Sequence, residues 1–134
     1  MGTFSGAVSL ASFQPTQEPS AANQQMQKDV DAIKSGAQLT SGTVAGYFAA
    51  DFFIQALKKA GLSPTPEKVQ AAASKMTFAI KGLVGPTKYP SSTVIPTPSC
   101  SALMSSDGTA FSVVNPYQCS SKTYPVQSKY KDFG

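Results

Sequence analysis

The sequence predicts an α/β fold, and three observations support this prediction. Hydrophobic spacing of the helical kind recurs between residues 20 and 76, in three segments that each start beside a capping residue. Short β-prone runs lie on both sides of these segments, and an Asp-Gly turn joins the last two. The middle helical segment is so apolar that other elements must cover it. We therefore expect three helices, short strands and a late hairpin.

The chain opens with a β-prone run, Thr3–Phe13, that carries no charge. Uncharged runs of this kind are typical of buried strands. The following stretch, FQPTQEPSAAN, contains two prolines and predicts a linker. Because a chain rarely begins directly with a buried strand, we interpret the sequence as a piece of a larger fold.

A polar helix is predicted over Ser20–Ile33. Met26, Val30 and Ile33 lie at spacings of four and three residues, which gives one narrow apolar stripe. Ser20 or Asn23 can cap its start. A Ser-Gly pair follows and predicts its end.

The longest helix is expected between a cap at Thr40 or Ser41 and a left-handed residue at Gly61. Its apolar side chains cover a wide face: Val44, Tyr47, Phe48, Phe52, Ile54 and Leu57. We expect this helix to lie on a sheet and to touch a second element. Lys58 and Lys59 fall in its last turn, where they offset the negative end of the helix dipole.

A third helix is predicted over Pro66–Lys75, because Thr65 is a good cap, proline suits the first helical position and Glu67 suits the first turn. The β-prone residues Thr77–Ile80 follow it.

The last third of the chain differs in composition. Gly82–Cys100 is rich in Pro, Gly and Ser and predicts a loop with little regular structure. Ser101–Met104 and Ala110–Val114 are predicted to pair as strands around the Asp107-Gly108 turn. Asn115-Pro116 is expected to end the second strand.

The composition argues against several classes of function. The formal charge is +4, yet the chain contains no Arg, the preferred residue for phosphate and guanine recognition, so we expect no nucleic-acid partner. It contains no His either, which removes the commonest general base and the Ser-His and Cys-His nucleophile pairs. Phosphate-binding glycine motifs are absent as well. We therefore expect neither an enzyme nor a cofactor.

Cys100 and Cys119 are the two cysteines. An even count in a chain with 13% charged residues favours a disulfide formed in an oxidising compartment. Such a bond would stabilise the fold by roughly 3 kcal/mol. The alternative is two free buried thiols in a reduced protein. A metal site is not expected, since two thiolates without His leave zinc short of ligands.

Two aromatic residues are candidate ligand-binding residues. Phe13 closes the first strand, and Tyr47 lies in the first turns of the long helix. Strand ends and helix N-termini are places where α/β proteins bind small molecules. The alternative for both is packing in the core. Asp51, the acid within the apolar helix, is expected to meet solvent or a Lys.

The chain lacks an apolar run near the ~20 residues of a membrane span. Its first ten residues lack the basic region of a signal peptide. If the protein is exported, we expect its signal to lie outside this chain.

The order of these elements resembles the C-terminal third of type I periplasmic binding proteins. The nearest group is the branched-chain amino-acid type of ABC-transporter solute-binding protein, in its actinobacterial form. The family's Tyr-x-Ala-Ala helix with an A-L-x-x-A-G ending corresponds to Tyr47–Gly61, and a short helix follows at Pro66–Lys75. The glycine before the closing hairpin corresponds to Gly82 or Gly85, and the last strand to Phe111–Val114.

The resemblance implies a two-lobed receptor about three times this length that clamps a ligand by hinge closure. Residues 1–19 would be a strand and hinge linker, residues 20–81 the helical part, and residues 82–134 a loop-rich part with the hairpin. Tyr47 resembles the aromatic residue that borders the cleft. Phe13 lies where the chain leaves one lobe for the hinge.

The resemblance also implies a function: an extracytoplasmic solute-binding component of an ABC importer that binds an amino acid or a similar small polar solute. Its partners would be the membrane permease and either the N-terminal remainder of its own fold or a second copy. The proline-rich loop and the cysteine pair depart from the family pattern. The alternative is a secreted, disulfide-stapled structural or interaction module without a small ligand.

Overall fold

The computed structural model describes residues 4–88 and 99–121. Within them the elements are β1 (Val8–Ala11), α1 (Ala21–Ile33), α2 (Ser41–Ala60), α3 (Pro66–Lys75), β2 (Thr77–Ile80), β3 (Val84–Lys88), β4 (Cys100–Ser106) and β5 (Phe111–Cys119). This is the predicted α/β fold with three helices, short strands and a late hairpin.

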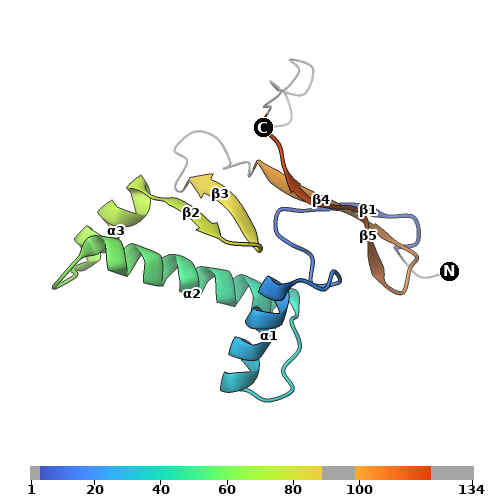
Figure 1. Ribbon diagram of the computed structural model, residues 1–134, viewed down its shortest axis with the longest axis horizontal. Helices are drawn as coiled ribbons and strands as arrows, with labels where there is room; N and C mark the ends of the chain where they lie inside the picture. The colour runs from blue at the N-terminus through green and yellow to red at the C-terminus, as the bar shows by residue number, and fades with distance from the viewer. Residues whose placement is uncertain (1–3, 89–98, 122–134) are drawn as a thin grey trace.

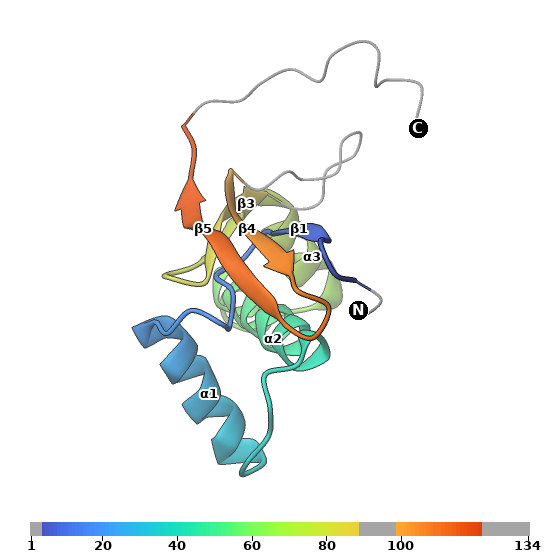
Figure 2. The same cartoon turned by 90° about the vertical axis from the view of Figure 1, so that its right-hand side faces the viewer.

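The elements form two halves (Figure 1). The helical half, residues 20–88, contains the three helices and the antiparallel pair β2–β3. The strand half, residues 4–11 and 99–121, is an antiparallel sheet in the order β1-β4-β5. The chain therefore passes between the halves twice, once over residues 12–19 and once between β3 and β4. Figure 2 shows α1 projecting away from both sheets.

Each helix begins at a side-chain cap. The hydroxyls of Ser20, Thr40 and Thr65 accept hydrogen bonds from backbone N–H groups in the first turns of α1, α2 and α3. Each of these bonds satisfies a donor that has no partner within the helix. Gly61 ends α2 with φ of 81°, a conformation that glycine adopts freely. The predicted starts of all three helices are confirmed.

Helix α2 organises the core of the helical half. Near its start, Val44 packs with the fully buried Met26 of α1 and with Leu83. Near its end, Ala56 packs with Met76 and with Phe78 of β2. Helix α2 thus contacts a sheet and two other helices, as its wide apolar face predicted. Burying side chains of this size stabilises the fold by about 1.5–3 kcal/mol each.

The first strand differs from its prediction. Strand β1 spans only Val8–Ala11, and Val8 and Leu10 are 65% and 72% exposed. The reason is that β1 is an edge strand with one packed face, where Ala11 joins Ala102 and Met104 in a small core. The prediction of a buried strand is therefore wrong for the outer face. Thr3 lies outside the described residues.

The prediction of an irregular loop from Gly82 is also wrong near its start. Strand β3, Val84–Lys88, pairs with β2 because the backbone reverses at Gly82, whose φ is 77°. The prolines in this stretch mask the strand signal in the sequence. Residues 89–98 of the predicted loop lie outside the described residues.

The last strand is longer than predicted, since β5 continues through Pro116 to Cys119. It is an edge strand, and Pro116 lies where the register between β4 and β5 shifts. At such a position the missing N–H of proline removes no ladder bond. The hairpin turn is confirmed: the Asp107 carboxylate accepts bonds from the Thr109 and Ala110 N–H groups and the Thr109 hydroxyl. These bonds lower the pKa of Asp107 to about 2.

Candidate functional site

The candidate site is the junction, which we define as the region where residues 12–15 and β3 meet the strand half. Two backbone segments of the chain run together there, because the Gln14 N–H donates to the Leu83 carbonyl over 2.8 Å. The Tyr117 hydroxyl of β5 reaches both segments. It accepts from the Gly85 N–H at 2.8 Å and donates to the Ser12 carbonyl at 3.4 Å.

Beside the junction lies a cluster of three aromatic rings, Phe13, Tyr47 and Phe48. Phe48 makes edge-to-face contacts with both others, at ring-centroid distances of 5.6 Å to Phe13 and 6.4 Å to Tyr47. All three pack against the core formed by Met26, Val44 and Leu83. The structure therefore brings the two predicted ligand-binding residues to one cluster and gives both a packing role. Their role in ligand binding stays a prediction.

Tyr47 also carries a polar contact that the sequence did not suggest. Its hydroxyl donates a 2.8 Å hydrogen bond to the Asp29 carboxylate of α1. Burial, and then the bond to Asp29 and its charge, raise the pKa of Tyr47 to about 12. Tyr47 is thus a neutral hydrogen-bond donor at physiological pH. The pair places one carboxylate and one hydroxyl next to the aromatic rings.

Asn23 holds the first crossing segment in place. Its side-chain amide donates to the carbonyls of Pro15 and Glu18, at 2.8 and 2.9 Å. Asn23 is buried, and its side-chain oxygen has no partner. The sequence identified Asn23 only as a possible cap, and the cap itself is Ser20. The consequence is that the linker enters α1 in one defined conformation.

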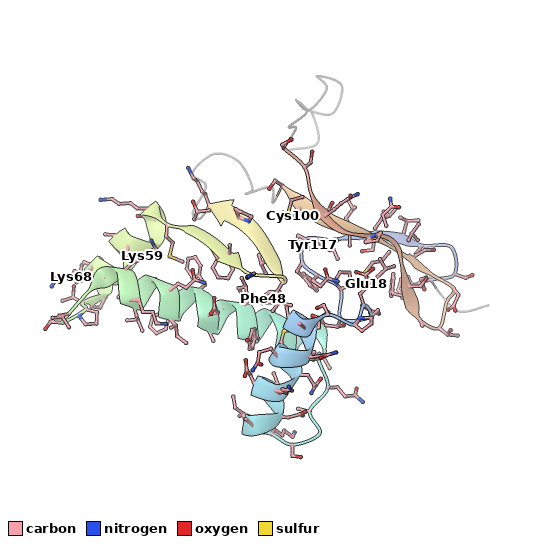
Figure 3. All side chains as sticks on the ribbon, in the orientation of Figure 1. Glu18, Phe48, Lys59, Lys68, Cys100 and Tyr117 are labelled. Atoms are coloured by element: carbon pink, nitrogen blue, oxygen red, sulfur yellow. A yellow bond between two sulfur atoms is a disulfide. The ribbon has the colours of Figure 1, made fainter. Side chains whose placement is uncertain are left out.

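The disulfide lies at the edge of the junction. Cys100 and Cys119 are directly opposite in the β4–β5 pair and are bonded, as the first of the two sequence interpretations predicted. Figure 3 shows Cys100 and Tyr117 close together where the strand half approaches β3. Sequence analysis missed Tyr117, which follows Pro116 in a stretch predicted to be outside any strand.

A hollow lies between α2 and α3, apart from the junction, and we call it the α2–α3 groove. Its volume is about 780 Å³. Glu67 and Gln70 supply the polar part of its lining. The rest of the lining is aromatic rings and small side chains, namely Phe48, Ala49, Phe52, Ala71, Ala73, Ser74 and Phe78. The wide apolar face of α2 predicted that such a surface needs a cover, although it did not locate the groove.

Other candidate residues have local partners. Asp51 is half-buried and so still meets solvent, and it also accepts a hydrogen bond from Gln55, whose amide donates to the Ala79 carbonyl as well. Lys58 and Lys59 lie in the last turn of α2 as predicted. Within residues 4–88 and 99–121, no three His, Cys, Asp or Glu side chains are grouped to hold a metal ion. The helices in this described part are too short or too polar to cross a membrane.

Comparison with known proteins gives two findings. A sequence profile described as periplasmic binding protein matches residues 2–108. The chain is also similar in structure to a fatty acid ABC transporter substrate-binding protein from Thermomonospora curvata, with a TM-score of 0.64 and 21% sequence identity. That similarity covers 85% of this chain and 30% of the neighbour, so the chain spans less than a third of the neighbour's length. A search of curated proteins finds no match.

Proposed function

The chain belongs to the type I periplasmic binding protein family, and from this premise we propose that it is part of the extracytoplasmic solute-binding component of an ABC importer. The solute binds between two lobes that close over it by hinge motion. The helical half belongs to one lobe and the strand half to the other. Along the chain, residues 1–19 are a strand and hinge linker, residues 20–81 a helical part, and residues 82–134 a loop-rich part that contributes β3 to the helical half and the hairpin to the strand half.

The observation that carries this proposal is the junction between the two halves, where the first crossing segment lies beside an aromatic cluster. Ligand sites favour such boundaries, because two bodies can enclose a small molecule more fully than one surface can. Tyr47 and Phe13 are the proposed ligand contacts. The Tyr47 hydroxyl and the Asp29 carboxylate supply polar groups, and the rings of Phe13 and Phe48 supply apolar area.

We propose an amino acid or a similar small polar solute as the ligand. The paired carboxylate and hydroxyl beside the aromatic cluster support this choice, since a carboxylate can bind an ammonium group. A second candidate is a fatty acid, because the structural neighbour is a fatty acid ABC transporter substrate-binding protein. The apolar rings at the junction are the feature of this chain that favours it.

The partners follow from the same proposal. A membrane permease receives the solute, and the remainder of the receptor completes both lobes and supplies most solute contacts. A second copy of the chain can take the place of that remainder in vitro. Neither catalysis nor nucleic-acid binding is part of the proposal. The competing proposal, a secreted interaction module stapled by its disulfide, needs no small ligand.

Calorimetric titration of the natural gene product with branched-chain and other amino acids, small amides and fatty acids tests the proposal. We expect one class of solute to bind, and Tyr47→Phe to weaken its binding about fivefold through loss of one hydrogen bond, of about 1 kcal/mol. Phe13→Leu should weaken binding as well, since it removes ring contacts while keeping an apolar side chain.

Phe53→Leu is the matched control, because Phe53 lies on the same helix, is 55% exposed and is absent from the cluster. It should leave the affinity unchanged. If none of these solutes binds, a transport role of this class is wrong and the interaction module is favoured. Equal effects of all three substitutions would remove Tyr47 and Phe13 from the site.

A further inference from the structure

The disulfide lies against the other half of the molecule, away from the tip of its own hairpin. Cys100 begins β4 and Cys119 ends β5, whereas the turn is at the opposite end, around Asp107. Cys100 is fully buried, and its neighbour across the junction is the backbone of β3. A Cβ atom added at Gly85 would lie 2.8 Å from the Cys100 Cβ, closer still to the Cys100 Sγ, and 3.3 Å from the Tyr117 hydroxyl. Only glycine permits this approach.

The same glycine is held by side-chain groups. Gly85 lies where the register between β2 and β3 shifts, and its N–H donates to the Tyr117 hydroxyl across the junction. Its carbonyl accepts from the Thr87 hydroxyl. The irregularity in the β2–β3 pair therefore frees one N–H group that the strand half uses.

Tyr117 and Cys119 are two residues apart on β5, so both side chains project from the same face of that strand. The bond from Cys119 to the buried Cys100 fixes this end of β5, and the Tyr117 ring then packs on Ala11, Ala102 and Met104. Its hydroxyl reaches β3 and the first crossing segment at once. One side chain of the strand half thus touches both the first crossing segment and β3 of the helical half.

A simple hairpin staple would not need these contacts. The β4–β5 pair already has a ladder along its length, and the Asp107 loop closes its other end. Nothing in that role requires Gly85 to approach the sulfur atom or Tyr117 to bond outside its own sheet. These two contacts cross the junction, so they indicate a link between the two halves of the molecule as well as a link between the strands of one hairpin.

We propose that the Cys100–Cys119 disulfide and the Tyr117 hydroxyl form a clasp that sets the orientation of the helical half relative to the strand half. Tyr117 is a positioning residue, which acts through Gly85 and Ser12. Breaking the disulfide releases this end of β5, and the two halves then reorient. The clasp itself does not depend on the proposed function. Only its consequence does, because the two halves that it orients are the proposed lobes.

The clasp is tested without any solute, on the whole 134-residue chain by NMR. Hydrogen exchange of the Gly85 amide reports the bond across the junction, and residual dipolar couplings report the orientation of α2 relative to β4 and β5. Tyr117→Phe should speed exchange of the Gly85 amide about fivefold, since one hydrogen bond of about 1 kcal/mol is lost. The double variant Cys100→Ala, Cys119→Ala should do the same and also change the couplings between the halves.

Ser112→Ala is the matched control. It removes a hydroxyl that bonds within the same hairpin, to the Ser105 carbonyl, and does not reach the junction. It should leave Gly85 exchange and the couplings unchanged. Amides of the β4–β5 pair near Asp107 should stay protected in every variant, which shows that the hairpin is still folded.

The proposal is overturned if the cysteine double variant keeps Gly85 protection and the original couplings while only its global stability falls. The disulfide is then a hairpin staple. It is also overturned if Tyr117→Phe leaves Gly85 exchange unchanged. These readouts separate the two proposals: solute binding can fail while the clasp persists, and the clasp can fail while solute binding persists.

Discussion

The junction, with the aromatic cluster beside it, and the α2–α3 groove meet at Phe48 of α2, yet they are packed in opposite ways. At the junction, aromatic rings contact one another, and backbone groups from β3 and the first crossing have partners across the boundary. The groove is an open hollow of about 780 Å³ that begins at Phe48 of the aromatic cluster and continues along α2, and Phe53, Ile54 and Leu62 are exposed on this half of the molecule.

The difference shows which contacts this chain completes by itself. The junction is closed by residues far apart in the sequence, such as Ser12, Gly85 and Tyr117, all of which the chain contains. The groove has aromatic and small side chains but no covering element among the described residues. Apolar surfaces of this kind usually mark an interface. Both sides of the junction belong to this chain, whereas the groove is one side of an interface whose other side is not among the described residues.

The largest effect on stability is expected from a substitution that adds an atom at the packed junction. Gly85→Ala must displace the Cys100 sulfur or β3, so we expect a loss of about 2 kcal/mol in the free energy of unfolding. Urea denaturation measures it. Gly46→Ala is the control, because its added Cβ meets nothing within 4 Å in the middle of α2 and should stabilise by about 0.5–1 kcal/mol. Equal effects would mean that the junction is loosely packed.

An intermediate effect is expected in the groove. We expect the chain to associate as its concentration rises, because the groove is uncovered. Ala71→Glu places a charge on the groove wall, so association should weaken about tenfold, the equivalent of about 1.4 kcal/mol. Sedimentation equilibrium measures the constant. Ala45→Glu, at an exposed position of α2 outside the groove, is the control. A chain that stays monomeric at high concentration would contradict this interpretation.

The smallest effect concerns the Tyr47–Asp29 bond beside the junction. The folded-state pKa of Tyr47, about 12, lies above its ordinary value of 10.0, so the neutral phenol is favoured by folding. Its stabilising contribution is complete below pH 10 and is lost as the pH rises from 10 to 12.

Tyr47→Phe should remove this dependence and cost about 1 kcal/mol at neutral pH. Thermal unfolding from about pH 8 to about pH 12 measures both effects. Tyr117 also has a raised pKa, through burial, so Tyr117→Phe is the companion variant that separates the two contributions. Identical pH profiles for the wild type and Tyr47→Phe would show that the Asp29 bond does not persist in solution.

Local signals predicted most of the helical half. Thr40, Gly61 and the Thr65-Pro66 pair mark helix ends through chemistry confined to a few neighbouring residues, and the structure agrees with them. The strands were harder, since β3 contains a proline and β5 runs through another. Their existence depends on partner strands, on a bulge and on an edge position, none of which is visible in a short window of sequence.

The candidate site divides in the same way. Tyr47, Phe13 and the cysteine pair stood out by residue type and position, and the structure brings the two aromatic residues together. Tyr117 and Asn23 could not be found, because their importance comes from hydrogen bonds to Gly85, Ser12 and Pro15 that form only on folding. The sequence predicted an uncovered face on α2, but the position of the groove depends on how α3 packs against that helix.

The sequence by itself determined the α/β class, the three helices with their caps, the hairpin turn and the resemblance to periplasmic binding proteins. These follow from local propensity and from the order of elements along the chain. Only the tertiary structure decided that β1 joins β4, that the disulfide lies against Gly85 and that one tyrosine bonds to both the first crossing and β3. Those contacts join residues up to 105 positions apart, and no local preference specifies them.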